Sequence, residues 1–415
     1  MERGPAGPQG HPATTGGPGL RLVLGAFGDP GHAFPMIALG RELAGRGHDV
    51  TLQTWVKWRE HVQREGMRFV AAPEYHVFPT RERPLKPYAA VVRAARETLP
   101  VIEECKPHAL ISDILTLAPA LAGEMAGVPV GTVIPHVHPW GVPGAPPYSM
   151  GARLPRSGLG RALWRGLEGP IASGLRQGRD ELNETRARLD LPPLSHFHGG
   201  ISRELALVAT FPELEYPRRW APHEHVVGPL MWEPPADEVE LPPGEDPLVL
   251  VAPSTSQDPD QRLLRCSLEA LAALPVRVLA TWNRRPPTRP LPHPANARLV
   301  EWVSYARTMP RCEIVICHGG HGTVVRALAS GCSVLVCPAA GDMNENAARV
   351  DWAGVGVRLP RRYASPRAIA LAVKRLIADP RRLERARALA RTPAAHDGPA
   401  TAADRVEAFA RASLR

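Results

Sequence analysis

The strongest chemical signal in the sequence is a glycine-rich turn between an apolar strand and a helix. The run Glu-Ile-Val-Ile-Cys before His318 is apolar and β-branched, which is typical of a parallel strand buried on both faces. His318, Gly320, Gly322 and Thr323 then form a turn, and an apolar-periodic helix is predicted from Val324 onward. Such a turn directs unpaired backbone N–H groups and the positive end of the helix dipole at one point. The segment therefore predicts an anion site.

A second turn follows the predicted strand at residues 333–337. Asp342 and Asn346 lie at the start of the next predicted helix. In a parallel sheet both turns reach the carboxyl edge, where such folds bind ligands. A carboxylate and an amide suit sugar hydroxyls, so an anion site beside them predicts a nucleotide-sugar ligand.

A histidine in the first half of the chain could act as a base. His32 ends the turn Gly-Asp-Pro-Gly-His, which joins a predicted strand at residues 20–27 to a predicted helix at residues 33–46. The positive end of the helix dipole disfavours an imidazolium ring, so we expect a neutral His32 that accepts a proton. The alternative is a histidine that only caps the helix.

Asp113 is the predicted partner of His32. It follows the apolar strand at residues 109–112, and neighbouring parallel strands bring their carboxyl ends together. A carboxylate there would hold the tautomer of His32 and stabilise the charged ring as the proton moves. Two alternatives stay open: Asp113 as the N-cap of the following helix, and Asp29 as a rival carboxylate.

The two turns form one ordered pattern, His318-x-Gly320-x-Gly322-Thr323 and then, after a strand, Gly341-Asp342-x-x-x-Asn346. This pattern resembles the donor signature of the family-1 inverting nucleotide-sugar glycosyltransferases, and most closely that of their bacterial natural-product, macrolide-type branch. The resemblance implies an α/β protein of the GT-B fold, in which two Rossmann-like, doubly wound parallel-sheet domains face each other across a cleft.

The same resemblance implies an activity, with His32 as general base and Asp113 as its partner. A sugar would pass from a UDP-sugar or dTDP-sugar to a hydroxyl of a small hydrophobic natural-product acceptor, with no obligatory cofactor and no metal. The implied donor-binding residues are Thr255, Trp302, Val303, His318, Gly320, Gly322, Thr323, Asp342 and Asn346.

The resemblance implies a specific role for several of these donor-binding residues. By resemblance, Thr255 reaches the phosphates, Trp302 stacks on the base and Val303 offers main-chain hydrogen bonds to the pyrimidine edge. Met343 stands where many relatives have Gln, which removes a polar contact to the sugar. Arg326 replaces a glutamate that binds the ribose diol in plant members, which favours a deoxyribonucleotide donor such as a dTDP-sugar.

The acceptor side is less determined by the sequence. Apolar side chains of the first domain could line a pocket, and each could equally belong to a core. They are Phe34, Trp55, Phe78, Trp140 and Met150.

The alternation of predicted strands and helices divides the chain of 415 residues into two α/β domains. The predicted parts are a disordered leader (1–19), an acceptor-binding domain (20–227), a linker rich in Pro, Glu and Asp (228–246), a nucleotide-sugar domain (247–400), and a C-terminal helix that returns to the first domain (401–415).

Composition excludes several other classes of protein. The net charge is +9, but the arginines are dispersed without interleaved aromatic residues, which argues against nucleic-acid binding. The six cysteines lack metal-ligand spacing, and the Asp258–Asp260 pair, which resembles a metal motif, suits a helix N-terminus. No apolar run has the roughly 18 residues of a spanning helix. We therefore expect a cytoplasmic protein. The sequence is compatible with a homodimer.

Two rival functions remain at this point. One is a sugar-nucleotide epimerase on the same two-domain plan, and the other is a catalytically silent homologue that activates a partner transferase. The joint presence of His32, Asp113, His318 and Thr323 argues against a silent homologue. The Trp- and Pro-bearing segment at residues 136–150 argues against an epimerase.

Overall fold

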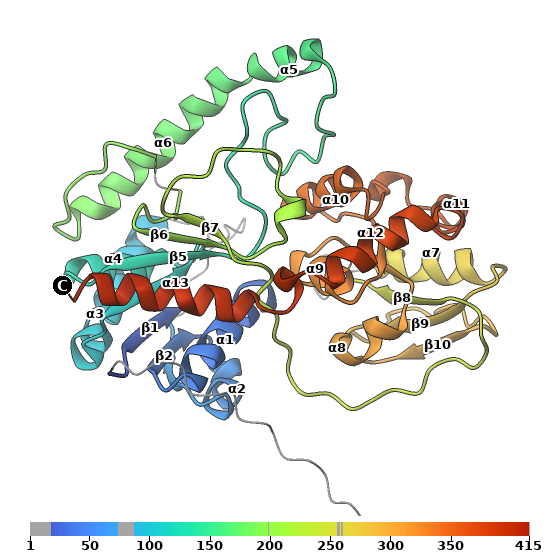
Figure 1. Cartoon of the computed structure of the whole chain (residues 1–415), viewed down its shortest axis with the longest axis horizontal. Helices are drawn as coiled ribbons and strands as arrows, with labels where there is room; N and C mark the ends of the chain where they lie inside the picture. Colours follow the sequence, from blue (N-terminus) through green and yellow to red (C-terminus); the bar gives the residue numbers. More distant parts are fainter. Residues whose placement is uncertain (1–17, 74–86, 198, 255–257, 259, 415) are drawn as a thin grey trace, which may run out of the picture.

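The chain folds into two lobes, each built on a parallel β-sheet with helices packed against it (Figure 1). The computed structural model describes residues 18–73, 87–197, 199–254, 258 and 260–414. All strand pairings in these residues are parallel. The predicted fold class, two doubly wound α/β domains, is confirmed.

The first lobe contains a seven-stranded sheet in the order β3-β2-β1-β4-β5-β6-β7. β4 and β5 are buried at every position, which is why their sequences are continuous apolar runs. The chain departs from β1 toward β2 and later returns to β4 on the other side, so a topological switch point lies between β1 and β4. The elements are β1 (Arg21–Gly25), α1 (Pro30–Gly45), β2 (Asp49–Thr54), α2 (Arg59–Arg64), β3 (Arg68–Ala71), α3 (Pro87–Cys105), β4 (Ala109–Asp113), α4 (Leu117–Met125), β5 (Val130–Ile134), β6 (Leu205–Val208) and β7 (Glu224–Val226).

The second lobe repeats this plan with a six-stranded sheet in the order β10-β9-β8-β11-β12-β13. Its switch point lies between β8 and β11. The elements are β8 (Leu248–Ala252), α7 (Arg262–Leu271), β9 (Arg277–Thr281), β10 (Ala297–Val300), α8 (Tyr305–Thr308), β11 (Ile314–Cys317), α9 (His321–Ala329), β12 (Ser333–Val336), α10 (Asp342–Ala353), β13 (Gly356–Arg358), α11 (Pro366–Ile377) and α12 (Pro380–Ala390).

Between β5 and β6 the chain leaves the first sheet. It forms α5 (Gly158–Arg165) and α6 (Glu168–Ala187), which project from the body of the molecule (Figure 1). No helix in the described part of the chain is both long enough and apolar enough to span a membrane.

Two segments join the lobes. Residues 228–246 contain neither helix nor strand. Leu230 and Trp232 pack in the core of the first lobe, and farther along Glu238 pairs with Arg311 of the second lobe at 3.1 Å. The last helix, α13 (Gly398–Ala412), returns to the first lobe, where Ala402 and Val406 share the hydrophobic core of β1 and α1 (Figure 1).

Candidate active site

In the first lobe, a histidine and a buried aspartate meet at the switch point. His32 is the third residue of α1, and its side chain keeps 17% of its surface exposed. Asp113 ends β4, whose Ser112 pairs with Gly25 of β1, so the two strand ends are neighbours. His32 Nδ1 lies 2.9 Å from Asp113 Oδ1. The contact places a base-competent ring beside a carboxylate.

Asp113 is held as an anion by several donors. The backbone N–H of Phe27 and the hydroxyl of Thr116 both donate to Oδ2 at 2.5 Å, and the N–H of Leu115 donates to Oδ1 at 2.8 Å. Burial alone would raise the pKa of Asp113, but His32 and these donors hold that pKa below its ordinary value.

Of the two alternatives, the helix cap is wrong, because the N-cap of α4 is Thr116. Asp29 is the N-cap residue of α1 without a side-chain cap bond, and its backbone carbonyl accepts the His32 N–H at 3.0 Å. The Asp29 charge also raises the pKa of His32, but Asp113 has the larger effect and makes the side-chain contact.

The expected direction of the His32 pKa is also wrong. Burial lowers this pKa, but the charge and hydrogen bond of Asp113 outweigh burial, and the pKa lies above its ordinary value of 6.5. A contacting carboxylate acts on the ring more strongly than the dipole argument from the sequence allowed.

In the second lobe, the glycine turn begins with a residue that only glycine suits. Gly319 has φ +91°, and a Cβ there would lie 2.9 Å from Val336 Cγ1 and 3.0 Å from the Met343 carbonyl oxygen. A Cβ on Gly320 would lie 2.6 Å from His318 Nε2, so the imidazole packs directly against this glycine. The turn is therefore shaped by the His318 ring and by the strand behind it.

Helix α9 begins at His321, three residues before the predicted start at Val324. Gly322 and Thr323 consequently lie in its first turn, where a helix leaves N–H groups without a partner one turn earlier. The Thr323 N–H donates to the Gly320 carbonyl at 3.1 Å. His318 faces the same corner: burial lowers its pKa, and its Nδ1 is buried without a hydrogen-bond partner among the described residues. The neutral imidazole and the free end of the helix converge on one point.

The two corners face each other. Asp342, the first residue of α10, carries a charge that raises the pKa of His32 in the first lobe and that of His318 in the second. The Asp342 carboxylate therefore lies within electrostatic range of both histidines. This places the base candidate and the anion corner on the same side of the molecule as the start of α10.

Known proteins resemble this chain over most of its length. Residues 265–409 match the family model described as erythromycin biosynthesis protein CIII-like, C-terminal domain. The 4'-demethylrebeccamycin synthase of Lentzea aerocolonigenes is 29% identical over 94% of this chain and 99% of its own length. The O-mycaminosyltylonolide 6-deoxyallosyltransferase of Streptomyces fradiae is 27% identical over 94% of this chain and 98% of its own.

The protein is a glycosyltransferase that is similar to the family-1 natural-product enzymes.

Solved structures agree in fold. The glycotransferase of kitacinnamycin superposes with a TM-score of 0.74 at 21% identity, covering 95% of this chain and 100% of that one. The glycosyltransferase VinC in complex with dTDP superposes with a TM-score of 0.68 at 18% identity and the same coverage. The predicted family, the GT-B fold and the enzyme class are confirmed.

Sequence reasoning missed the role of His321 in this glycosyltransferase. Its Nδ1 lies 3.2 Å from Asn346 Oδ1, and its Nε2 lies 3.2 Å from the carbonyl oxygen of Ala209 in the first lobe. Asn346 also donates from Nδ2 to the Gly319 carbonyl at 2.9 Å. Both ends of the Asn346 amide thus hold the glycine turn, and the sugar contact that the resemblance implies stays a prediction.

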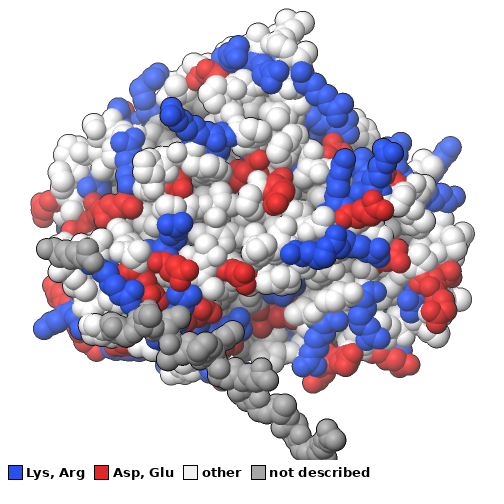
Figure 2. Space-filling view, viewed as in Figure 1, with Lys and Arg blue, Asp and Glu red and all other residues white. Residues whose placement is uncertain are grey.

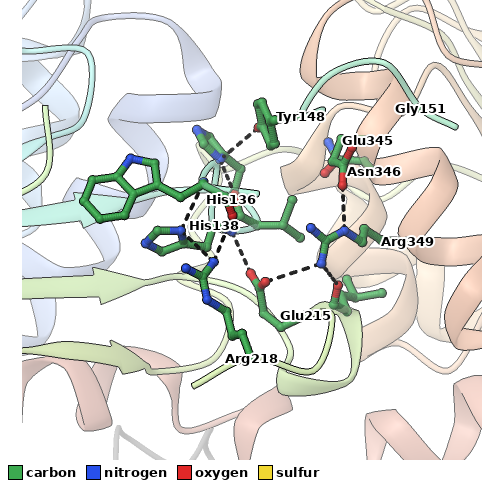
Figure 3. A network of polar contacts seen from close by, with 12 residues as sticks. His136, His138, Tyr148, Gly151, Glu215, Arg218, Glu345, Asn346 and Arg349 are labelled. Atoms are coloured by element: carbon green, nitrogen blue, oxygen red, sulfur yellow. Dashed lines mark hydrogen bonds and ion pairs between the residues drawn. The ribbon is translucent and has the colours of Figure 1, made fainter. Parts of the chain in front are cut away.

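A second residue that sequence reasoning missed is His136, after β5. Its Nδ1 lies 2.7 Å from the Val137 carbonyl oxygen and 3.2 Å from the Tyr148 hydroxyl, and its other nitrogen points away from Tyr148 (Figure 3). Burial lowers its pKa, and the charges of His32 and Asp342 also act on it. The signal was available, because His136 follows a buried parallel strand just as Asp113 ends one.

The residues predicted to bind the nucleotide base are partly covered by other parts of the second lobe. Trp302 stacks with Tyr305 at a centroid distance of 6.4 Å and an angle of 16°, and the Arg284 guanidinium lies 4.7 Å from the Trp302 centroid. A base would therefore need Arg284 to move or would use the opposite ring face. Val303 is buried in the core of the second lobe, and Thr255 lies outside the described residues.

The ribose corner contains a carboxylate that the sequence argument did not consider. Glu233, from the linker, accepts hydrogen bonds from Ser304 Oγ at 2.5 Å and from the N–H of Ala306 at 3.1 Å. Its other oxygen lies 3.8 Å from Arg326 Nε. A carboxylate therefore lies beside Arg326, and the deoxyribonucleotide donor that Arg326 favours stays a prediction.

Among the acceptor candidates, Trp55 lies nearest to the base. Its ring stands edge-on to Phe27 at 4.9 Å, and Phe27 stands edge-on to His32 at 6.0 Å. A Cβ on Gly28 would lie 2.0 Å from the Trp55 ring, so this glycine allows the indole to approach the turn.

The other candidates are more dispersed. Phe34 packs against Trp232 of the first-lobe core, with ring centroids 5.0 Å apart. For Phe34, the structure therefore favours a place in the core over one in an acceptor pocket. Trp140 contacts His138 at 5.4 Å, Met150 is 51% exposed, and Phe78 lies outside the described residues. Among the candidates that the structure describes, Trp55 is the one linked to His32 by ring contacts, through Phe27.

A buried polar network joins the lobes beside this site (Figure 3). Arg349 on α10 donates to Glu345 at 2.7 Å and to Glu215 of the first lobe at 3.4 Å, and its guanidinium lies 3.4 Å from the Tyr216 centroid. Glu215 in turn accepts the N–H of His138 at 2.6 Å. The loop after β5 is therefore tied to the helix that carries Asp342.

Asp258 does not resemble a metal ligand. It is buried, accepts the N–H groups of Arg262 and Leu263 at 3.2 and 3.0 Å, and pairs with Arg361 at 2.8 Å. These contacts are those of an acidic residue at a helix N-terminus. Within the described residues, no three His, Cys, Asp or Glu side chains gather in a group that could hold a metal ion.

Proposed function

We propose that the protein is an inverting glycosyltransferase that moves a sugar from a dTDP-sugar or UDP-sugar to a hydroxyl of a small hydrophobic acceptor. The observation that carries this proposal is the His32–Asp113 pair, and the Asp342 charge, which acts on both His32 and His318, supports a common site with the glycine turn. A base on one side and an anion site on the other are what a direct displacement at the anomeric carbon requires.

The base would act through the free nitrogen of His32. Because Nδ1 contacts the Asp113 carboxylate, the proton resides on Nδ1, and Nε2 keeps the lone pair. Nε2 takes the proton of the acceptor hydroxyl while its oxygen attacks the anomeric carbon. Asp113 stabilises the imidazolium that forms, and the bond from that carbon to the diphosphate oxygen breaks on the opposite face.

The leaving diphosphate would be stabilised at the glycine turn. The unpartnered Nδ1 of His318, the first N–H groups of α9 and the Thr323 hydroxyl can each bind a phosphate oxygen. Asp342 would accept hydrogen bonds from the sugar hydroxyls, and Asn346 and His321 would keep the turn in shape. The thymidine diphosphate bound to two structural neighbours supports a nucleoside diphosphate at this corner.

The acceptor class rests on the relatives and on Trp55. Both relatives described above carry names of enzymes that act on antibiotic scaffolds. The half-buried indole of Trp55 offers an apolar surface next to His32 on which such a scaffold can pack. We infer a role in the biosynthesis of a natural product of this kind.

The test is a release assay with purified protein. dTDP-glucose and UDP-glucose are each incubated with and without a panel of hydrophobic polyketide and aromatic acceptors, and free nucleotide and glycoside are separated by chromatography. We expect nucleotide release that depends on the acceptor, and a glycoside whose anomeric configuration is inverted by NMR. Release or sugar epimerisation at the same rate without acceptor would support an epimerase instead.

A further inference from the structure

The projecting helices α5 and α6 carry an apolar ridge that nothing in the described chain covers. The ridge residues recur every fourth position, which keeps them on one face of each helix. Leu159 and Leu163 are 74% and 70% exposed, and the other three are 38–39% exposed. The ridge consists of Leu159, Leu163, Leu167, Ile171 and Leu175.

These helices receive little support from the body of the protein. α5 has no buried residue, and the buried residues of α6 are Thr185 and Arg186, near its far end. Both helices also contain glycines, which disfavour the helical state. They are Gly158 and Gly160 in α5, Gly166 between the helices, and Gly169, Gly174 and Gly178 in α6. A helical pair this exposed and this rich in glycine gains stability when a partner covers its apolar face.

The charges around the ridge are almost all positive. Arg156, Arg161, Arg165 and Arg176 are exposed and form no ion pair with any described residue, and Glu168 is the acidic residue among them. In α5 the arginines follow the leucines by two positions, which places them on the opposite side of the helix. Figure 2 shows mostly blue side chains along the upper edge, where Figure 1 places α5 and α6.

This charge pattern distinguishes between two partners that could cover the ridge, a second copy of the chain and a lipid bilayer. A second copy of the chain would bring the same arginines together, and like charges oppose that association. An apolar face flanked by arginines is instead the pattern of a helix that lies in the plane of a bilayer. The leucines enter the acyl boundary, while the long arginine side chains reach anionic head groups.

We propose that the α5–α6 ridge docks the enzyme on an anionic lipid surface. Docking would order the two helices and hold the enzyme where a hydrophobic acceptor collects. The surface is recognised by its chemistry, namely acidic head groups above an apolar layer.

The test is co-sedimentation of the full chain with vesicles. One set is phosphatidylcholine alone, and in the other phosphatidylglycerol replaces a quarter of it. We expect binding to the second set that weakens with salt and falls at least about fivefold in each of the double variants L159S/L163S and R161E/R165E. The matched controls are L371S, because Leu371 on α11 is 60% exposed, and R367E, because Arg367 is also exposed; both should bind as the unmodified chain does.

Three outcomes would overturn the proposal. They are absence of vesicle binding, equal binding by the ridge variants and the controls, and equal binding to both vesicle sets. Light scattering adds a fourth: a dimer that L159S/L163S converts to a monomer would assign the ridge to self-association. Circular dichroism checks that each variant is folded, which we expect because the ridge lies outside the hydrophobic cores.

Discussion

The two lobes present the same local structure to the site but give their histidines opposite properties. In each lobe a buried parallel strand ends in a glycine-containing turn, and a helix begins within a few residues. In the first lobe the turn histidine, His32, contacts a buried carboxylate, and its pKa is raised. In the second lobe burial dominates, and the pKa of His318 is lowered.

The difference shows that the neighbour, rather than the turn, decides what an imidazole can do. With Asp113 against Nδ1, the His32 ring can take and stabilise a proton. Without such a partner, the His318 ring stays neutral and can form a hydrogen bond to an anion. One strand–turn–helix unit thus supports proton transfer in one lobe and ligand binding in the other.

Replacing His32 by Ala should have the largest effect. Loss of the base should lower kcat by about 10²- to 10⁴-fold, while the Kd for dTDP changes by less than about twofold. Rapid-quench kinetics and calorimetry measure the two quantities. If His32→Ala retained turnover, His32 would not be the base. The assignment of proton transfer to the first lobe would then be wrong.

Asp113→Asn should lower kcat/KM by at least about tenfold, because the amide no longer stabilises the imidazolium. The base must be unprotonated, so activity in the unmodified enzyme should fall as the pH drops through a pKa above 6.5. In the variant the charge of Asp113 is gone, and burial of His32 is opposed only by the weaker effects of the Asp29 and Asp342 charges. The pKa of His32 therefore decreases, and the acidic limb of the pH–rate profile should move to lower pH. A limb that stays in place would show that Asp113 does not set the pKa.

His318→Ala should weaken nucleotide binding, whereas His32→Ala should lower kcat and leave binding nearly unchanged. Removing a hydrogen bond to a charged phosphate costs about 1.5–3 kcal/mol, which raises the Kd for dTDP roughly 10- to 100-fold. Calorimetry with dTDP measures this directly, with His32→Ala as the matched control. Equal nucleotide affinity in the two variants would contradict the assignment of the anion corner.

The glycine turn allows a matched pair for stability. Gly319→Ala forces a side chain onto a φ of +91° and against Val336, and should cost about 1–3 kcal/mol. At Gly322 a Cβ would meet nothing within 4 Å, so Gly322→Ala should be near neutral. Chemical denaturation measures both. Similar losses in the two variants would show that the turn is not held by backbone conformation.

A third imidazole, His138, tests the effect of burial through pH. Its Nδ1 accepts from the Trp140 N–H at 3.2 Å and from Arg218 at 3.0 Å, and burial lowers its pKa to about 3. Its contribution to stability is complete above pH 6.5 and is lost as the pH falls toward 3, with a slope of up to about 1.4 kcal/mol per pH unit.

The variant His138→Asn keeps an acceptor oxygen near the position of Nδ1 and removes the titration. The slope of unfolding free energy against pH between 3 and 6.5 should therefore flatten in the variant. An unchanged slope would show that other groups account for the acid sensitivity.

The sequence by itself determined the elements and the residue types at their ends. Apolar β-branched runs such as the one before His318, and the glycine turns after them, are local patterns, so they predicted two doubly wound sheets and the polar residues at their carboxyl edges. The ordered donor pattern around Gly320 and Asp342 predicted the family for the same reason.

Only the tertiary structure decided which of these residues meet. It selected Asp113 over Asp29, raised the pKa of His32 against the expectation from the helix dipole, and used Asn346 and His321 to hold the glycine turn against Ala209. These outcomes depend on burial and on contacts between residues about 80 or more positions apart in the chain. A sequence pattern read over a few turns does not contain them, because electrostatic free energies are set by the neighbours that folding supplies.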